Sequence, residues 1–158
     1  QKDVTEHAMI CELSNFLNND VHVTLSIEPV TSILALNEFL DVLRSYDPMA
    51  IHFFKNIDKN TLFKGQEQFF IGKHNAVTTT IAMLLETDNS CGVFTLMTQK
   101  DMQKKGYATA MMKFLMNRAK VAGFQFLTLS ASSDAGYHIY DRLGFIKISE
   151  FDCFEYVG

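Results

Sequence analysis

The stretch Gln-Lys-Lys-Gly-Tyr-Ala at positions 103–108 restricts the possible folds of this chain more than any other. An apolar run ends before it, near Thr98, and an amphipathic run begins at Tyr107, so a strand should end and a helix should begin here. The first turn of a helix has backbone N–H groups without internal partners and carries about half a positive charge. Gly106 lets an anion approach these groups closely. The stretch therefore predicts a phosphate-binding loop.

The residues after this loop predict a helix and then a strand. Apolar side chains recur at helical spacing from Ala108 to Ala119, in a methionine-rich stripe, and Gly123 ends the pattern. A strand is expected at 124–130. Because a helical crossover joins parallel strands, we expect this strand to pair in parallel with residues 91–98.

The segments before the loop predict further strands and helices. β-branched runs and turn residues predict an antiparallel meander over 68–73, 76–86 and 91–98. A strand is expected at 21–27, followed by helices at 33–43 and 49–57, the first capped by Thr31 or Ser32 after Pro29. Within residues 1–20, the spacing of Ile10, Leu13 and Phe16 predicts a short helix in an N-terminal extension.

The C-terminal part predicts one more helix and two short strands. The helix lies within 131–145, is capped by Ser133 or Asp134, and ends at Gly144. Strands are expected at 145–148 and 151–156, antiparallel around a turn at Ser149–Glu150.

Composition limits the class of protein. The 158 residues fit one domain, and no apolar run approaches the ~18 residues of a membrane span. A net charge of −4 argues against a nucleic-acid surface and favours a cationic acceptor. Cys11, Cys91 and Cys153 are an odd number without metal-ligand spacing, so we expect free thiols, a reducing compartment and a cytoplasmic location, and no signal peptide pattern is present.

Two motifs together point to a known family. The single glycine of 103–108 fits neither a nucleotide P-loop nor a dinucleotide fingerprint. Instead, Gln-x-x-Gly-x-Ala opening a helix, followed later by Gly136-x-x-x-Tyr140-x-x-Leu143-Gly144-Phe145, resembles the GNAT family of acetyl-CoA-dependent N-acetyltransferases. The resemblance covers residues 67 to 150 well and the front of the chain in outline.

The resemblance implies a fold and a reaction. The fold is a single α/β domain over residues 1–158, with a mixed, mostly antiparallel sheet, a central parallel pair splayed at the cofactor, and about four flanking helices. The reaction is transfer of an acetyl group from acetyl-CoA to a primary amine, on a small molecule or a peptide, without a metal. Monomer and homodimer both fit, and neither nucleic acid nor membrane is expected as a partner.

It also implies the residues that bind the cofactor. The loop amides would hold the diphosphate of coenzyme A, and the strand ending at Thr98 would lie beside its pantetheine arm. Lys104 and Lys105 either add charge at the 3′-phosphate or form a solvated loop. Ser133 stands where the family often has an asparagine. The expected set is Leu96, Met97, Thr98, Gln103, Lys104, Lys105, Gly106, Tyr107, Ala108, Thr109, Ser133, Gly136 and Tyr140.

Two residues are candidates for catalysis. Tyr140 matches the tyrosine of the family's second motif and could protonate the departing thiolate, the alternative being a tyrosine that packs on the sheet. A lysine-like amine must also lose a proton, at a cost of about 4–5 kcal/mol at neutral pH. The strand 91–98 has no carboxylate, so Glu86 is the nearest substitute base, or else a surface charge. His52 is interpreted as a surface or packing residue, and His138 as facing away from Tyr140.

The missing carboxylate keeps a second function open. A non-catalytic acyl-CoA-binding or interaction module could use the same fold and the same loop. A nucleic-acid module built on Lys104 and Lys105 is disfavoured by the acidic balance of the chain.

Overall fold

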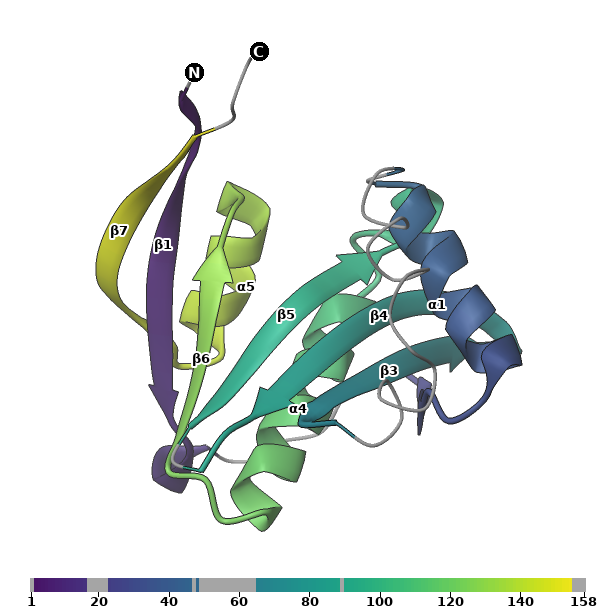
Figure 1. The fold of residues 1–158 in the computed structure, drawn as a ribbon, viewed down its shortest axis with the longest axis horizontal. Coiled ribbons are helices and arrows are strands. Elements are labelled where there is room, and N and C mark those ends of the chain that lie inside the picture. Colours follow the sequence, from purple (N-terminus) through teal and green to yellow (C-terminus); the bar gives the residue numbers. More distant parts are fainter. Residues whose placement is uncertain (1, 17–22, 47, 49–64, 89, 155–158) are drawn as a thin grey trace.

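A computed structural model describes residues 2–16, 23–46, 48, 65–88 and 90–154 of the chain. These residues form a seven-stranded sheet of order β2-β3-β4-β5-β6-β1-β7 (Figure 1). The strands are β1 (Lys2–Glu12), β2 (Ser26–Pro29), β3 (Glu67–His74), β4 (Val77–Glu86), β5 (Cys91–Thr98), β6 (Phe126–Ala131) and β7 (Ile146–Phe154). The helices are α1 (Ile33–Arg44), α4 (Tyr107–Val121) and α5 (Asp134–Arg142), with single 3₁₀ turns η1 (Leu13–Asn15) and η2 (Lys100–Met102).

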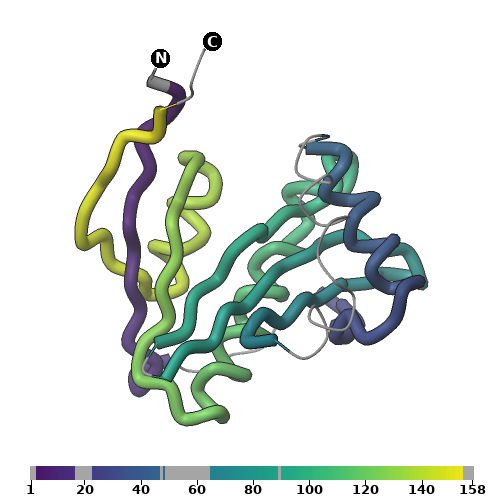
Figure 2. Tube along the Cα trace, viewed as in Figure 1, coloured from purple at the N-terminus to yellow at the C-terminus, as the bar shows by residue number. Residues whose placement is uncertain are grey.

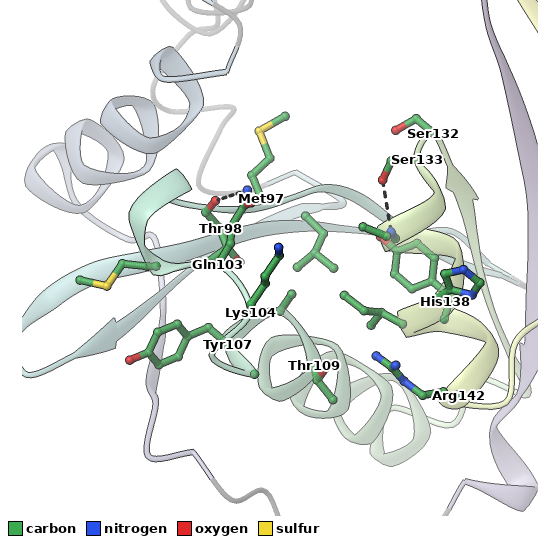
Figure 3. Close-up of a pocket in the computed structure, with 18 of the residues that line it drawn as sticks. Met97, Thr98, Gln103, Lys104, Tyr107, Thr109, Ser132, Ser133, His138 and Arg142 are labelled. Atoms are coloured by element: carbon green, nitrogen blue, oxygen red, sulfur yellow. Dashed lines mark hydrogen bonds between the residues drawn. The ribbon is translucent and has the colours of Figure 1, made fainter.

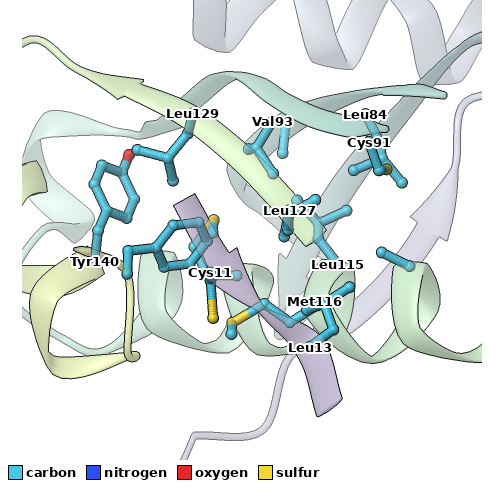
Figure 4. Close-up of a cluster of buried hydrophobic side chains, with 14 of the residues drawn as sticks. Cys11, Leu13, Leu84, Cys91, Val93, Leu115, Met116, Leu127, Leu129 and Tyr140 are labelled. Atoms are coloured by element: carbon cyan, nitrogen blue, oxygen red, sulfur yellow. The ribbon is translucent and has the colours of Figure 1, made fainter. Parts of the chain in front are cut away.

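Helices cover the sheet on both faces. Phe69 and Ile71 of β3 point to one face and pack in a cluster with α1, whereas Phe70 between them packs on the other face with α4. This alternation follows from the two-residue period of a strand, and it explains why β3 and β4 read as continuous apolar runs. The larger core lies between the sheet and the helices α4 and α5, where Leu115 and Met116 are fully buried (Figure 4).

The centre of the sheet holds its parallel strand pair. β5 and β6 pair in parallel over Cys91–Val93 and Leu127–Leu129 only, and the rest of β5 diverges from β6. A bulge in β5 opposite Ala82 adds to the bend, because the register shifts there and Thr95 adopts a φ of 53°. The mixed sheet with a splayed parallel pair is therefore confirmed.

The meander and the three helices also agree with the sequence patterns. Ser32 caps α1 by accepting a hydrogen bond from the Ala35 amide at 3.2 Å, and Ser133 caps α5 by accepting one from the Gly136 amide at 3.2 Å. Three α-helices occur in the described part of the chain, where about four were expected. The expected helix at 49–57 lies outside the described residues, and the strand expected at 21–27 is described as β2, from Ser26 to Pro29.

The helix expected near the N-terminus is wrong. Residues 2–12 form β1, which lies between β6 and β7 and pairs antiparallel with both. Met9 and Cys11 are buried at a spacing of two, as in a strand, while Leu13 belongs to the turn η1. The start of β1 and the end of β7 thus lie side by side, as Figure 2 shows, because Lys2 pairs with Phe154.

The pair of short strands expected at the C-terminus is also wrong. Residues 146–154 form one strand, β7, which continues through Ser149 and Glu150 without a turn. The pairing register shifts between Ala8 and Met9 of β1, which pair with Ser149 and Lys147, so β7 has one extra residue at this point but no turn. Pairing with β1 along its length holds β7 extended, which a local turn signal cannot indicate.

Candidate active site

A pocket of about 620 Å³ opens beside the splayed strands. Its walls come from the end of β5, the loop before α4, the first turn of α4, and α5 (Figure 3). Every residue that the sequence assigned to the cofactor lines this pocket except Lys105. The Lys105 amine instead donates a hydrogen bond to the Asp101 carbonyl at 3.1 Å and contacts the Met102 sulfur at 3.4 Å.

The loop before α4 has the backbone shape of an anion site. Gly106 is the N-cap in the left-handed region, with a φ of 87°, and Lys104 also has a positive φ of 61°. Tyr107, Ala108 and Thr109 of the first turn line the pocket, and their amides are among the helix's orphan donors. A Cβ on Gly106 would lie 2.9 Å from Cγ2 of Val23. Position 106 therefore favours glycine for two reasons, the left-handed backbone conformation and the lack of room for a Cβ.

A hydrogen-bonded contact joins α1 to the end of β5. The Tyr46 hydroxyl, just after α1, donates to the Thr98 carbonyl and accepts from the Gln103 amide. The Gln103 amide also lies 3.4 Å from the Thr98 carbonyl. We call Tyr46, Thr98 and Gln103 the Tyr46 clamp. It directs the Gln103 amide group to the pocket wall, where it anchors the loop.

The opposite wall places Tyr140 in the cleft between the parallel strands. Its side chain is 8% exposed and extends from α5 toward Leu129 of β6 (Figure 4). A Cβ on Gly136 would lie 3.3 Å from Cε2 of Tyr140, so the glycine gives the ring room to lie back along the helix. Burial raises the pKa of Tyr140 to about 12. The hydroxyl therefore keeps its proton throughout the neutral range.

The charges at the pocket are cationic, although the chain is acidic. Lys104 and Arg142 line the pocket, as does His138, whereas no carboxylate is among the lining residues in the described part of the chain. The net charge of the chain is −4. Within the described residues, Lys104 and Arg142 make no ion pair and no hydrogen bond. The pocket is thus suited to an anionic ligand.

Glu86, the other catalytic candidate, lies apart from this arrangement. Glu86 pairs with Cys91 at the end of β4, while Thr80 of β4 pairs with Thr98, so Glu86 is about 20 Å along the strand from the pocket end. His52 lies outside the described residues. His138 lines the pocket, although its spacing from Tyr140 predicted a different face.

Sequence reasoning missed several lining residues. They are Tyr46, Met102, Ser132, Ala135, Ile139 and Arg142. The spacing of four between His138 and Arg142 places both on one side of α5, which could have indicated Arg142 once Tyr140 and Gly136 were placed. Tyr46 has no such local signal, because its contacts are made with residues far along the chain.

Comparison with known proteins shows the family to which this fold and pocket belong. The family model described as "Acetyltransferase (GNAT) domain" matches residues 42–157. The chain therefore belongs to the GNAT acetyltransferase family. No curated protein matches the sequence.

Solved structures show the same fold at low sequence identity. A GCN5-related N-acetyltransferase from Kribbella flavida has a TM-score of 0.68 and 13% identity over 93% of this chain and 56% of its own. A Bacillus subtilis acetyltransferase in complex with CoA has a TM-score of 0.62 and 18% identity, over 77% of this chain and 76% of its own. A predicted acetyltransferase with acetyl-CoA from Clostridium acetobutylicum has a TM-score of 0.58 and 16% identity, over 79% of this chain and 92% of its own. The chain thus spans little more than half of the Kribbella flavida protein.

None of the helices described here is long and apolar enough to cross a membrane.

Proposed function

We propose that this chain transfers an acetyl group from acetyl-CoA directly to a primary amine on a small molecule or peptide. The observation that carries the proposal is a pocket lined by the N-terminus of α4 on one wall and by Tyr140 on the other. The two similar structures that contain CoA and acetyl-CoA support the choice of cosubstrate.

The loop supplies the binding energy for the cofactor in this proposal. The amides of Tyr107, Ala108 and Thr109, with Lys104 beside them, would hold the diphosphate, each charge-assisted hydrogen bond contributing roughly 1.5–3 kcal/mol. After the bulge at Thr95 the end of β5 pairs with β4 but not with β6, so Leu96 to Thr98 can face the pantetheine arm. These contacts would point the thioester toward the cleft between β5 and β6.

The chemistry needs two proton movements. The neutral amine attacks the thioester carbonyl carbon, the C–S bond of the tetrahedral intermediate breaks, and the acetyl group stays on nitrogen. The amine loses one proton, and the departing thiolate gains one, from the Tyr140 hydroxyl in this proposal. The tyrosinate then recovers a proton from solvent or from the amine.

Burial keeps the Tyr140 hydroxyl protonated at neutral pH, and it also makes this hydroxyl a weaker acid. A tyrosine pKa of about 12 lies some 3.5 units above a free thiol, so proton transfer to an ordinary thiolate would be uphill by about 5 kcal/mol. A thiolate formed in the same apolar cleft is destabilised by the same loss of water, so the pKa of the thiol rises as well and the difference from the pKa of Tyr140 becomes smaller. Tyr140 would therefore act on a desolvated thiolate close to its hydroxyl.

Two residues are candidates for the base that takes the proton of the amine. Glu86 is the base proposed from the sequence, and it would require a proton relay along β4, whereas His138 lies at the pocket. Glu86→Gln and His138→Gln should be compared over a pH series of kcat/KM. A loss of the acidic limb in Glu86→Gln supports Glu86, and its loss only in His138→Gln moves the role to His138.

A second function is favoured by the absence of a carboxylate among the described lining residues. The chain would then be a non-catalytic acyl-CoA-binding or interaction module. Slow thioester hydrolysis without acetylation of any amine would support this reading.

Titration calorimetry with acetyl-CoA, followed by thiol release in the presence of an amine panel, tests both functions. Saturable binding together with amine-dependent thiol release is expected. Binding without amine-dependent release would favour the module, and no binding at millimolar acetyl-CoA would end both proposals.

A further inference from the structure

The two cations of the pocket come from opposite walls. Lys104 belongs to the loop that leads into α4, whereas Arg142 is the last residue of α5. Figure 3 shows Arg142 reaching from α5 toward Thr109 on the first turn of α4. The anion-binding surface thus continues from the loop past Thr109 to the C-terminal end of α5.

Arg142 is far from the reacting end of the pocket. It lies six positions after Gly136, against which the Tyr140 ring lies, and this corresponds to about 9 Å along the helix. The Tyr140 ring lies back toward Gly136, in the opposite direction from Arg142. A group bound by Arg142 therefore belongs to the part of the ligand beyond the diphosphate, away from the thioester.

We propose, on the basis of the proposed function, that Arg142 binds the 3′-phosphate of coenzyme A and makes the pocket prefer CoA over 3′-dephospho-CoA. Coenzyme A carries two phosphate groups of different kinds, a diphosphate diester and a phosphate monoester. The proposed function assigns the α4 amides and Lys104 to the diester, which leaves the monoester for the second cation. A guanidinium matches a terminal phosphate because its fork can donate two parallel hydrogen bonds.

This assignment differs from the sequence expectation that placed Lys104 and Lys105 at the 3′-phosphate. The Lys105 amine is bonded to the Asp101 carbonyl within its own loop. Arg142 has no hydrogen-bond or ion-pair partner among the described residues, so ligand binding costs it no existing contact.

The test is calorimetric titration of the whole chain with CoA and with 3′-dephospho-CoA at low ionic strength. The unmodified chain should bind CoA about tenfold more tightly, which corresponds to about 1.4 kcal/mol. Arg142→Gln should lose this preference, with CoA binding weakened and 3′-dephospho-CoA binding unchanged. Arg142→Lys should keep part of the preference, because the charge remains without the fork.

Two further variants separate the alternatives. Lys147→Gln removes the same charge from β7, where Lys147 pairs with Glu150, and should change neither affinity. Lys104→Gln should weaken both ligands equally, because the diphosphate is common to them. Raising the salt concentration should shrink the preference for CoA, as for any exposed charge pair.

Several outcomes would overturn the assignment. Equal weakening of both ligands in Arg142→Gln would place Arg142 at the diphosphate, and no change for either would make it a solvated side chain. If the unmodified chain bound both ligands equally, the proposed function would stand and this inference would fall. If it bound neither, the proposed function would fall as well.

Discussion

Tyr140 has a buried ring and lines the pocket. A substitution that keeps the ring can therefore test the role of the hydroxyl without disturbing the packing. Tyr140→Phe keeps the ring and removes the acid. We expect kcat to fall by about 10²- to 10³-fold, within the range of a general acid, and the affinity for acetyl-CoA to change less than twofold. Steady-state kinetics with calorimetry would measure both. Tyr137→Phe, on the same helix beside His7, is the matched control and should leave kcat unchanged. Equal kcat for Tyr140→Phe would remove Tyr140 from the mechanism.

The raised pKa of Tyr140 also predicts how stability depends on pH. In the unfolded chain tyrosine ionises near pH 10, whereas in the folded chain the pKa of Tyr140 is about 12. Between these values the unfolded state binds fewer protons, so the free energy of unfolding falls as pH rises, by up to about 1.4 kcal/mol per pH unit. Stability from this group is complete below pH 10. Urea unfolding from pH 9.5 to 11 should show a shallower decline in Tyr140→Phe, and identical slopes would contradict the shift.

The residues that the sequence assigned to the cofactor and that line the pocket are brought together by local geometry. Gly106 is required by a left-handed N-cap, and Gly136 and Tyr140 lie one helical turn apart, so short-range geometry brings them to the site. Tyr46 reaches the site only through tertiary contact. Glu86 was chosen because it was the nearest carboxylate in sequence, and strand geometry carries it to the other end of β4.

The helix α1 and the end of β5 are held together by the Tyr46 clamp, which makes the phosphate loop depend on a distant element. Tyr46→Phe removes the hydroxyl and keeps the ring, including its contact with Lys100. The variant loses two hydrogen bonds, from Tyr46 to the Thr98 carbonyl and from Gln103 to Tyr46, but Gln103 can still donate to the Thr98 carbonyl. A net loss of about 0.5–1.5 kcal/mol should therefore raise the KM for acetyl-CoA roughly three- to tenfold. The value of kcat should change little, because the reacting end of the pocket is intact.

A neighbouring substitution controls for damage to the helix end. Ser45→Ala removes a hydrogen bond from Ser45 to the Val42 carbonyl, at the same end of α1 but within the helix. Its KM should equal that of the unmodified chain. If Ser45→Ala and Tyr46→Phe raised KM alike, general fraying of α1 would explain the effect and the clamp would not.

Elements with a strong local pattern were predictable, and elements fixed by distant pairing were not. The meander, α1, α4 and α5 each have periodic apolar residues and their own caps or turns. β1 was assigned as a helix because Ile10, Leu13 and Phe16 recur at three, yet the strand ends at Glu12 and Leu13 begins a turn. β7 was divided at Ser149 and Glu150, because its continuity depends on β1, far away in sequence.

The arrangement of the sheet makes the N-terminal strand an internal one. β1 pairs with β6 over residues 7–12 and with β7 over most of its length, and Met9 and Cys11 are buried. β7 pairs on one side only, and its residues are exposed apart from Cys153, which is half-buried. Opening β7 therefore disrupts one ladder, whereas opening β1 disrupts two and exposes core side chains.

Hydrogen exchange should reveal this difference directly. The amides of Met9 and Cys11 should exchange at least tenfold more slowly than the amides of β7, although β1 begins at residue 2, where chain ends usually fray. The amides of β4, which is paired on both sides and covered by α1 and α4, provide the slow reference. β5 and β6 are joined by only three residue pairs, so the hydrogen bonding between these two strands is the least extensive near the point where they diverge. If β1 and β7 exchanged equally fast, they would open from β6 together as a pair of strands, and β1 would not be an integral part of the sheet that positions Tyr140.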